Sequence, residues 1–533
     1  MTSYQDSRDA FDWNEILAAL DWPAHGPVNV ASTLADRHAD SPHVALDWRG
    51  KNGERRRLSF AELAERSARF AGLLAARGVG KGDRVAMIMP RVPETVIAML
   101  GIWRAGAIYV PIFSAFGADA ICMRLHDSGA KLLLTHTDYA DGLGTARAAV
   151  SAVIVVGDGY DDAMAAAEPA DPVPMNRRDP ACLLYTSGST GTPKGVIIAT
   201  NFVASIAPAI RHCADLKPGD VFWPSGDPAW GYGMICYANA LAFGCGVTMW
   251  QAQPNAEAAL DFLAANNVTN LATVPTLLRG IMALGVDRVR AADAPVRRIW
   301  SCGEPLNAEA VRFFRDVWGT PPLDTYGSSE MGLPVGNLAA LPDDVRPGSM
   351  GRPLPGHWVD VIDDAGERAD DDTVGLIGLA HSEQGFYATH YWNNEALTDE
   401  VFGQRWIVTN DLGRRDADGF LWFEGRSDDV IKSAGYRIGP FEVESALLEH
   451  PAVAEAGVVG KPDDLRGHLI MAYVVLVPGQ SGNAALEEEL AKTVRGHLGA
   501  HAVPRAFAFV TELPKTESGK IQRFKLRSEA AET

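Results

Sequence analysis

The chain has 533 residues, of which 47% are hydrophobic and 22% charged, and its formal net charge is −19. This composition is typical of a globular protein, and at about 150 residues per unit the length predicts roughly three to four structural units, each able to bury a core. The acidic balance excludes a protein whose main partner is nucleic acid, because phosphate backbones bind basic surfaces. A small anionic ligand is still compatible, since it needs only a local positive site.

Cysteine usage and the N-terminus predict a cytoplasmic protein. The N-terminal sequence MTSYQDSRDAFDWNE is acidic and lacks the basic and apolar regions of a signal peptide. The cysteines show no C-x-x-C pair and no metal-type spacing, which in a chain of this length indicates reduced, mostly buried thiols. They are Cys122, Cys182, Cys213, Cys236, Cys245 and Cys302.

One segment is long enough to span a membrane. Residues 228–256 contain no charged side chain. The segment is interrupted by glycine, proline, Asn239 and two glutamines, and no cationic cluster flanks it. We therefore expect no membrane span there, but a buried or pocket-lining segment.

The first 350 residues predict alternating helices and buried strands. Residues 59–74 have apolar side chains at helical spacing, and a Gly-rich turn and a strand from Val85 follow. The same pattern returns at 92–113 and 308–327. Short apolar runs bounded by turn residues, as buried strands would be, occur at AKLLLTHT, SAVIVVGD and NLATVP. Helices that alternate with such strands indicate α/β layers.

After about residue 350 the pattern changes to short antiparallel strands. Residues 358–380 and 416–429 alternate apolar and polar side chains and contain turn residues such as Asp-Gly. A smaller α+β unit follows, with helices expected at 440–451 and 485–498 and two strands between them. We place a domain boundary near Gly425–Asp429.

The stretch YTSGSTGTPKGV, residues 185–196, is too polar and too rich in glycine for a core or a good helix. Backbone amides and hydroxyl groups in such a loop can form a concave donor surface for phosphate oxygens, and a lysine adds a positive charge. The common nucleotide motifs do not fit, because Lys194 is followed by Gly195 and no G-x-G-x-x-G occurs here. Taken alone, the stretch is compatible with either a phosphate site or a surface linker.

Five motifs in order favour the phosphate site. The longer stretch CLLYTSGSTGTPKGVIIAT resembles the phosphate-binding loop of the adenylate-forming enzymes, which include acyl-CoA synthetases, firefly luciferase and peptide-synthetase adenylation domains. Four later stretches resemble further motifs of this family, and with the region before residue 180 the resemblance covers essentially the whole chain. They are DTYGSSE, TNDLGRRDADG, GRSDDVIKSAGYRIGPFEVE and LPKTESGKIQRFKLR.

The resemblance implies a fold and a reaction. The expected fold is α/β, with a large N-terminal domain of layered α/β sheets (1–427) that includes a small β-barrel-like subdomain. A small mobile α+β domain (428–533) follows. The family uses ATP and Mg²⁺ to convert a carboxylic acid to acyl-AMP and pyrophosphate. The acyl group then passes to coenzyme A, which releases AMP. Positive charge must gather at the α-phosphate in the first step, because two anions meet there.

By the same resemblance, two sets of residues bind ATP. Glu330 would be the Mg²⁺ ligand, and Asp411 and Arg426 would hold the ribose hydroxyls. Ser329 stands where the family usually has threonine, and its hydroxyl can make the same phosphate contact. The phosphate set is Thr186, Ser187, Gly188, Ser189, Thr190 and Lys194, and the adenine set is Gly303, Glu304, Pro305, Asp324, Thr325, Tyr326 and Gly327.

The C-terminal motifs imply the remaining catalytic parts. Lys520 would be the mobile catalytic lysine that bridges the carboxylate and the α-phosphate, and Asp428 lies at the hinge position. Gly435 and Tyr436 would form part of the pantetheine tunnel, and Arg437 falls where the family has a phosphate-contacting arginine. Acetyl-CoA synthetases have Ser-Gly before the aromatic residue, whereas this chain has Ala-Gly, so a side-chain contact to coenzyme A there is not expected.

The acid itself is predicted from the acyl wall. Trp230 and Gly231 fall where relatives place that wall, and without a cation in the segment a monocarboxylate is expected. Gly327 occupies the position of a second tryptophan in acetyl-CoA synthetases, so we expect a deeper pocket. Because one methylene is worth only about 1–3 kcal/mol, the pocket would prefer a chain length. We expect a short- or medium-chain fatty acid of about four to ten carbons by this analogy, with benzoate-type aromatic acids and acetate or propionate as alternatives.

Three other functions share these motifs. A carrier-protein adenylating enzyme would normally continue into a carrier segment after the lysine motif, a luciferase-like oxygenase would emit light with oxygen, and a non-catalytic adenylate sensor would lose Lys194, Glu330 or Lys520. All three residues are present. Oligomers are compatible with the sequence, which predicts no particular state.

Overall fold

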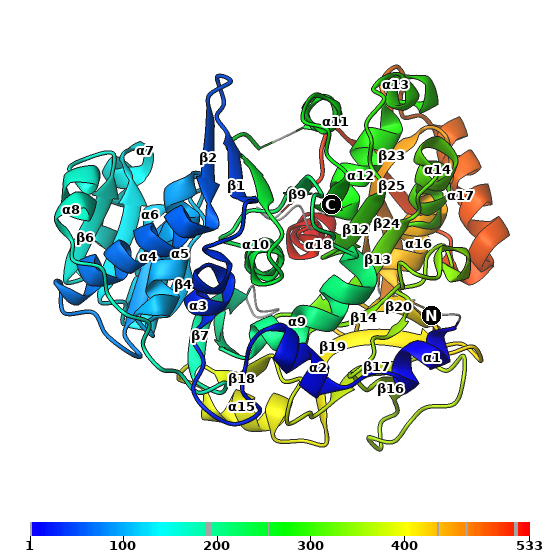
Figure 1. Cartoon of the computed structure of the whole chain (residues 1–533). Coiled ribbons are helices and arrows are strands. Elements are labelled where there is room, and N and C mark those ends of the chain that lie inside the picture. Colours follow the sequence, from blue (N-terminus) through cyan, green and yellow to red (C-terminus); the bar gives the residue numbers. More distant parts are fainter. Residues whose placement is uncertain are drawn as a thin grey trace.

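We analysed a computed structural model of the chain, which describes residues 3–186, 193–253, 255–433, 436–463, 467–515 and 521–532. For residues 432, 436, 437 and 532 only the backbone is described. Three sheets and their helices make up the part before residue 427, and a fourth sheet belongs to the C-terminal part (Figure 1). The expected α/β fold class is confirmed.

The first sheet has seven strands in the order β18-β8-β7-β4-β3-β5-β6. Its central strands are parallel, whereas β8 pairs antiparallel with both β7 and β18. The strands are β3 (Arg84–Ile88), β4 (Ile108–Pro111), β5 (Leu132–His136), β6 (Ala152–Val156), β7 (Pro180–Thr186), β8 (Lys194–Ala199) and β18 (Ala388–Tyr391).

Helices cover both faces of this sheet. Since successive strand residues face opposite sides, Val85 and Met87 pack in the core with α4 (Phe60–Ala75) and α5 (Pro93–Arg104), while Ile88 packs on the opposite side with α6 (Ala118–Ser128). The predicted helix start is well defined, because Ser59 and Glu62 form a capping box at α4.

The second sheet has nine strands in the order β15-β14-β13-β12-β11-β9-β10-β1-β2. Antiparallel strands flank its parallel centre at both edges. The strands are β1 (Val44–Arg49), β2 (Arg55–Ser59), β9 (Phe222–Pro224), β10 (Val247–Trp250), β11 (Asn270–Thr273), β12 (Arg298–Cys302), β13 (Pro322–Ser328), β14 (Gly332–Gly336) and β15 (Arg352–Pro353).

The uncharged segment supplies a helix between these two sheets and β10 of the second sheet. Neighbouring residues of β12 face opposite sides of the second sheet. Trp300 packs in the core that contains α9 (Phe202–Ala209) and α10 (Gly231–Ala242), and Ile299 packs in the core on the opposite face. That second face carries α11 (Ala256–Ala265), α12 (Pro275–Ala283), α13 (Val286–Ala291) and α14 (Ala308–Trp318). Among the residues that the structure describes, no helix is both long and apolar enough to cross a membrane.

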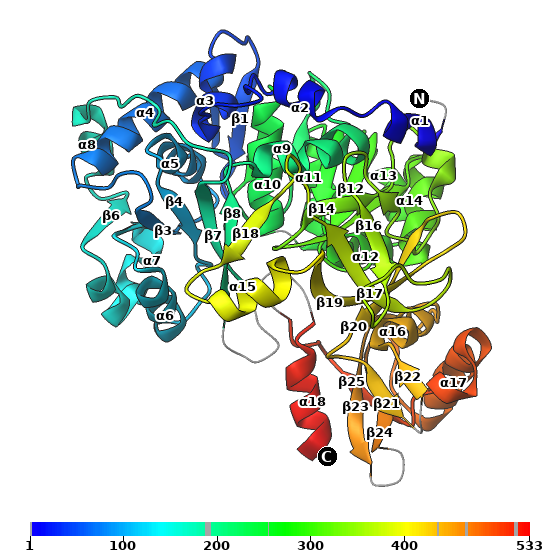
Figure 2. The same ribbon diagram turned by 90° about the horizontal axis from the view of Figure 1, so that it is seen from below.

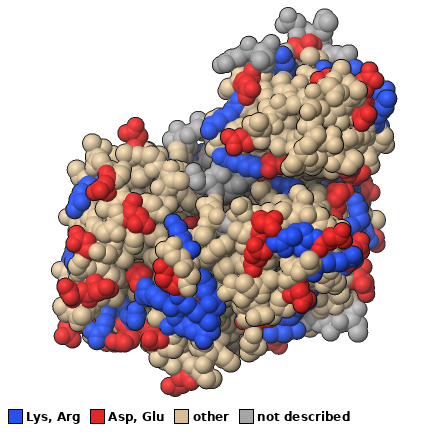
Figure 3. All heavy atoms as spheres, turned by 90° about the horizontal axis from the view of Figure 1, so that it is seen from above, with Lys and Arg blue, Asp and Glu red and all other residues tan. Residues whose placement is uncertain are grey.

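Basic side chains gather over the hairpin of β1 and β2 (Figure 3). Arg49, Arg55 and Arg57 surround the single carboxylate of Asp47, and Arg56 pairs with Glu94. Strand β2 is the outer strand of its sheet. Charges on an exposed edge strand oppose pairing with another chain, which accounts for this cluster in an acidic protein.

The third sheet is the small all-β unit expected after residue 350. Its four antiparallel strands run in the order β16-β17-β19-β20, with β16 and β20 as outer strands of an open sheet. The strands are β16 (Val359–Ile362), β17 (Gly375–Ala380), β19 (Trp406–Arg415) and β20 (Leu421–Arg426), and α15 (Glu395–Phe402) lies between β18 and β19 in the sequence.

Shorter elements complete the part before residue 427. They are α1 (Tyr4–Asp9), α2 (Trp13–Ala19), α3 (Val30–Leu34), α7 (Thr137–Ala140), α8 (Tyr160–Ala166), the 3-10 helices η1 (Asp36–His38), η2 (Asp141–Ala149) and η4 (Pro342–Asp344), and the π-helix η3 (Ile210–Ala214).

The C-terminal part forms a separate lobe (Figure 2). Its sheet has the order β22-β21-β24-β23, and β25 also pairs with β24. The elements are β21 (Ile431–Ser433), β22 (Tyr436–Ile438), α16 (Pro440–Leu448), β23 (Val453–Asp463), β24 (Gly467–Leu476), α17 (Ala484–Leu498), η5 (Ala500–Ala502), β25 (Ala506–Val510) and α18 (Arg523–Glu532). Two hydrophobic clusters of this lobe contain only residues after 430. The boundary at residues 427 and 428 stays a prediction.

We predict that Leu490→Ala loosens the C-terminal lobe alone. Leu490 is fully buried in α17, in a cluster of that lobe, and such a truncation costs about 2–5 kcal/mol. Amide hydrogen exchange should therefore rise within 431–510 and stay unchanged before residue 427. The matched control is Leu260→Ala, since Leu260 is equally buried in α11. If Leu490→Ala speeds amide hydrogen exchange both in the C-terminal lobe and before residue 427, the two parts of the chain unfold together.

Candidate functional site

The Gly/Ser/Thr stretch connects two paired strands. β7 ends at Thr186 and β8 begins at Lys194, and these two residues face each other in the antiparallel register. The Thr186 hydroxyl donates to the Lys194 carbonyl oxygen at 3.4 Å. The structure therefore places both ends of the stretch side by side, while Ser187, Gly188, Ser189 and Thr190 lie outside the described residues.

Contacts from two other elements hold these ends. The Tyr185 hydroxyl donates to Asp127 Oδ2 at 2.6 Å, and the Trp392 indole Nε1 donates to the Asp127 carbonyl oxygen at 2.9 Å. The Trp392 amide donates to the Gly195 carbonyl oxygen at 2.7 Å. Asp127 of α6 thus joins one flank of the stretch to the residue that follows β18.

A buried carboxyl group lies on β13, where the second motif begins. Asp324 is 5% exposed, and burial raises its pKa well above the usual range. Within the described residues its Oδ1 has no hydrogen-bond partner. Next to it, Thr325 accepts from Trp300 Nε1 at 3.1 Å and donates to the Ser301 carbonyl oxygen at 2.8 Å. Thr325 therefore has structural contacts, while Asp324 has spare capacity for a ligand donor.

Tyr326, Asp411 and Arg426 come together from three strands. The Tyr326 hydroxyl donates to Asp411 Oδ2 at 2.8 Å, and Arg426 Nη1 donates to Asp411 Oδ1 at 3.2 Å. Arg426 Nε also donates to Asp428 at 3.0 Å. The registers explain this meeting, because Asp411 of β19 is paired with Arg426 of β20. Asp428 lies at an exposed turn directly after β20.

Asn410, the residue before Asp411 in β19, has a positive φ of +66°. Asparagine tolerates this left-handed conformation better than most residues. The irregular backbone of β19 before Asp411 therefore fits the residue found there.

Glu330 has a partner that sequence reasoning missed. The hydroxyl of Tyr391, the last residue of β18, donates to Glu330 Oε1 at 2.7 Å. Burial and the charge of Glu330 raise the pKa of the Tyr391 hydroxyl, so it stays a donor at neutral pH. Ser329 and Glu330 lie in the turn between β13 and β14. The aromatic-rich stretch GFYATHYWNN was the only available signal for Tyr391.

The side chain of Glu304 is bound by α12. Gly303, Glu304 and Pro305 follow β12 directly. Glu304 accepts from the Thr276 amide and from Arg279 Nη2, both at 2.8 Å. Although burial acts to raise it, the pKa of Glu304 is held below its usual range by Arg279 and Thr276. This carboxylate therefore anchors the loop, and its backbone and neighbours are what a ligand could contact.

Trp230 and Gly327 define the expected acyl wall. A Cβ on Gly303 would lie 2.8 Å from the Trp230 ring, so the indole packs against the Gly303 loop. Gly231 begins α10 directly after Trp230. A Cβ on Gly327 would lie 1.7 Å from the Gly332 carbonyl oxygen. The backbone of β14 therefore lies close to Gly327, and the expectation that this glycine deepens the acyl pocket stays a prediction.

Several C-terminal predictions cannot be placed. Lys520 and Gly435 lie outside the described residues, and Tyr436 and Arg437 are described only as backbone of β22. The flanks of the lysine motif are defined, since Gln522 N donates to the Pro514 carbonyl oxygen at 2.8 Å. Arg523, just beyond, pairs with buried Glu444 at 2.6 Å.

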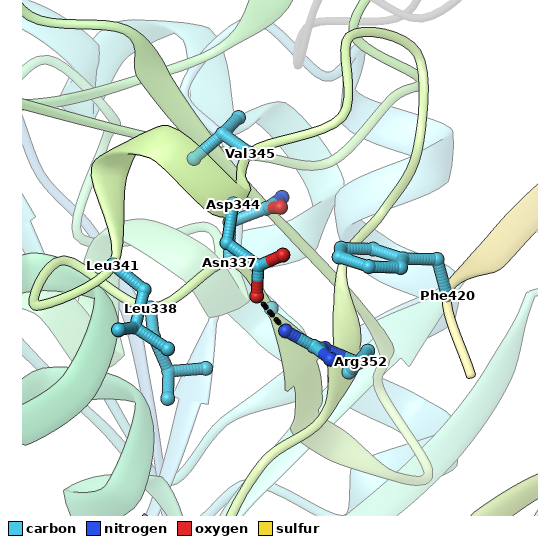
Figure 4. Close-up of a pocket in the computed structure, with 8 residues that line it drawn as sticks. Asn337, Leu338, Leu341, Asp344, Val345, Arg352 and Phe420 are labelled. Carbon is cyan, nitrogen blue, oxygen red and sulfur yellow. Dashed lines mark hydrogen bonds and ion pairs between the residues drawn. The ribbon is translucent and has the colours of Figure 1, made fainter. Parts of the chain in front are cut away.

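A small pocket elsewhere is not the candidate site. Figure 4 shows Arg352 pairing with Asp344 across it, beside Phe420. None of the motif residues lines this pocket. Asn337 connects it to the site only indirectly, because its Nδ2 donates to the Asp324 carbonyl oxygen at 3.1 Å.

The residues at and near the ends of β7, β13 and β20 have side chains of the kinds that bind a nucleotide with Mg²⁺. The orphaned buried Oδ1 of Asp324 can accept from a purine amino group. Tyr391 uses only part of the acceptor capacity of Glu330, which leaves hard oxygen lone pairs of the kind that Mg²⁺ prefers. Lys194, at the start of β8, adds positive charge near the phosphate-type loop.

The comparisons with known proteins match this chain to one enzyme family. The AMP-binding enzyme family matches residues 33–384, and the C-terminal domain of AMP-binding enzymes matches 442–520. An acetyl-coenzyme A synthetase of Bacillus subtilis (strain 168) is 34% identical, over 99% of this chain and 95% of the relative.

Two solved structures resemble the whole chain. A Brucella canis acyl-CoA synthetase is 37% identical with a TM-score of 0.79, and the match covers 99% of each chain. A benzoate CoA ligase from Burkholderia xenovorans LB400 is 29% identical with a TM-score of 0.84, covering 94% of this chain and 100% of that one. The chain therefore belongs to the AMP-binding enzyme family, as an AMP-forming acyl-CoA synthetase, which confirms the family that its motifs indicated.

Proposed function

We propose that this ligase activates a short-chain monocarboxylic acid of about two to four carbons, with acetate as the first candidate. The observation that carries this proposal is the filled space at Gly327, where a Cβ would meet the Gly332 carbonyl oxygen at 1.7 Å. A glycine that is backed by protein backbone gives no extra depth to a pocket. The acetyl-coenzyme A synthetase among the relatives supports the same length.

The wall also favours an acid with one carboxylate. Residues 228–256, which supply Trp230 and α10, contain no charged side chain. A second carboxylate would be buried there without a partner, which is costly. The medium-chain acids expected from the sequence stay a prediction, and the relatives favour a shorter chain.

A benzoate-type acid is the second candidate. The observation that favours it is the similarity to a benzoate CoA ligase over 94% of this chain. Trp230 and Tyr232 form an edge-on aromatic pair with ring centroids 5.5 Å apart, and such a pair can also contact an aromatic acid.

We assign the nucleotide contacts from the positions described above. Asp324 and Thr325 flank the adenine, on which Tyr326 stacks against the Gly303–Pro305 loop. Asp411 accepts from the ribose hydroxyls, with Arg426 beside it. The phosphates lie between Thr186, Lys194 and the loop that joins them, with Ser329 at the facing turn.

Positive charge and orientation carry the first half-reaction. Lys194 and Lys520 offset the repulsion between the acid and the α-phosphate, and Glu330 would hold Mg²⁺. When bound, this ion offsets the negative charge of the phosphate oxygens. The acid carboxylate attacks the α-phosphorus, the bond to the β-phosphate oxygen breaks, and pyrophosphate leaves. Positioning and charge neutralisation each contribute several kcal/mol, about 7–11 for ideal orientation.

The second half-reaction needs a different set of residues. The thiol of coenzyme A attacks the acyl carbon, and AMP leaves. We place Gly435 and Tyr436 beside the pantetheine arm and Arg437 at a phosphate. Asp428 is the proposed hinge between the parts 1–427 and 428–533.

The acid is tested by pyrophosphate release across a panel of acids. We expect the highest kcat/KM with acetate, propionate or butyrate, and a fall of about 10-fold or more by hexanoate, because longer chains meet the wall. Benzoate and succinate are included as aromatic and dicarboxylate controls. A maximum at hexanoate to decanoate would overturn the short-chain proposal and restore the medium-chain prediction.

Trp230→Ala should lengthen the accepted chain. Removal of the indole that packs against Gly303 opens the wall, so we expect the kcat/KM ratio of hexanoate to acetate to rise by about tenfold or more. Trp358→Ala is the control, because Trp358 is 63% exposed and lies directly before β16. An unchanged ratio in Trp230→Ala would show that the indole does not line the acyl pocket.

Lys520→Ala should separate the two half-reactions. We expect adenylation to fall by several orders of magnitude, about the 10³-fold or more of a lost transition-state charge, while thioester formation from supplied acyl-AMP continues. Pyrophosphate release and acyl-CoA formation are measured separately. Lys515→Ala is the matched control, since Lys515 pairs with Glu455 at 2.7 Å. Equal loss of both half-reactions in Lys520→Ala would contradict the assignment.

A further inference from the structure

Two consecutive residues contact three parts of the site at once. Tyr391 reaches Glu330 through its side chain, and Trp392 reaches Gly195 through its backbone and Asp127 through its indole. No motif that indicated the family contains either residue.

The hydroxyl of Tyr391 is held in one place by its surroundings. Tyr391 is 7% exposed, and its ring lies 5.8 Å from that of Phe402. Its amide donates to the Thr398 hydroxyl at 3.0 Å, and β18 pairs it with Val196 of β8. A tyrosine whose backbone is held by a hydrogen bond and a strand pairing, and whose ring packs against another ring, can hold its own hydrogen-bond partner in a defined position.

Glu330 lies in a turn, and the hydrogen bonds of that turn involve its backbone amide and not its carboxylate. The Ser328 hydroxyl accepts from the Glu330 and Met331 amides, each at 3.2 Å. These bonds shape the turn but do not orient the carboxylate. The hydrogen bond of 2.7 Å from Tyr391 to Oε1 does.

Trp392 contacts the residues that flank the phosphate-type loop. Its amide binds the carbonyl of Gly195, the neighbour of Lys194, and its indole binds the Asp127 carbonyl. The Asp127 carboxylate in turn accepts from Tyr185, the neighbour of Thr186. Both ends of the phosphate-type loop are therefore tied to the same dipeptide.

We propose that Tyr391 and Trp392 are positioning residues that set the distance from Glu330 to Thr186 and Lys194, so that one divalent cation can contact both the carboxylate and the phosphates. This inference rests on the proposed role of Glu330. Cation binding depends on ligand placement within a few tenths of an ångström, and loss of an outer hydrogen bond typically costs about 10–100-fold in metal affinity.

The experiment measures binding of Mn²⁺, as a paramagnetic probe for Mg²⁺, to the full chain with α,β-methylene-ATP. Mn²⁺ affinity is titrated by electron paramagnetic resonance, and affinity for the analogue alone is measured by calorimetry in EDTA. In Tyr391→Phe, which keeps the ring, we expect Mn²⁺ affinity to fall about tenfold while metal-free analogue affinity is unchanged. In Trp392→Phe, metal-free analogue affinity should itself fall several-fold.

Two further variants make the result decisive. Tyr4→Phe removes a hydrogen bond of the same length, 2.7 Å to the Pro353 carbonyl oxygen, from α1, and should change neither affinity. Glu330→Gln tests the proposed metal ligand itself. If Glu330→Gln weakens Mn²⁺ binding and Tyr391→Phe does not, the positioning role is wrong and the ligand assignment stands. If Glu330→Gln leaves Mn²⁺ affinity unchanged, the assignment of Glu330 and this inference both fail.

Discussion

The antiparallel pairing of β8 with both β7 and β18 is the constraint on which the site depends. β7 and β8 are close in sequence, but β18 comes almost two hundred residues later, and its pairing places Tyr391 opposite Val196. This register brings the start of β8 next to a strand that reaches Glu330 through Tyr391. The pairing therefore links the phosphate-type loop, which belongs to the first sheet, to a carboxylate in the turn between β13 and β14 of the second sheet.

Buried charge is the second feature of the site. Asp411 is 8% exposed, and it is tolerated because Tyr326 and Arg426 both donate to it. Asp324 is more deeply buried and lacks such a cation, so its pKa is raised by desolvation. The two carboxyl groups therefore differ in their partners, because Asp411 binds a tyrosine hydroxyl and an arginine whereas Asp324 Oδ1 has no partner among the described residues.

The layered architecture explains why the segment proposed as the acyl wall lacks charged groups. α10 lies in the core between two sheets, so its residues must be apolar for packing alone. Trp230, the residue before α10, is half-buried and meets the Gly303 loop. The lack of charge along α10 thus has a structural cause.

The sequence by itself determined the family and the α/β layers, because these depend on local patterns and on motifs of defined spacing. Only the tertiary structure decided which side chains meet. Tyr391 is invisible to motif reasoning because its partner Glu330 lies 61 positions away. Two other features also arise from contacts between distant segments. Arg279 of α12 binds the Glu304 carboxylate, and the Gly332 carbonyl oxygen lies where a Cβ on Gly327 would be. A glycine indicates a missing side chain in the sequence, but only packing decides whether a ligand or another backbone segment takes its place.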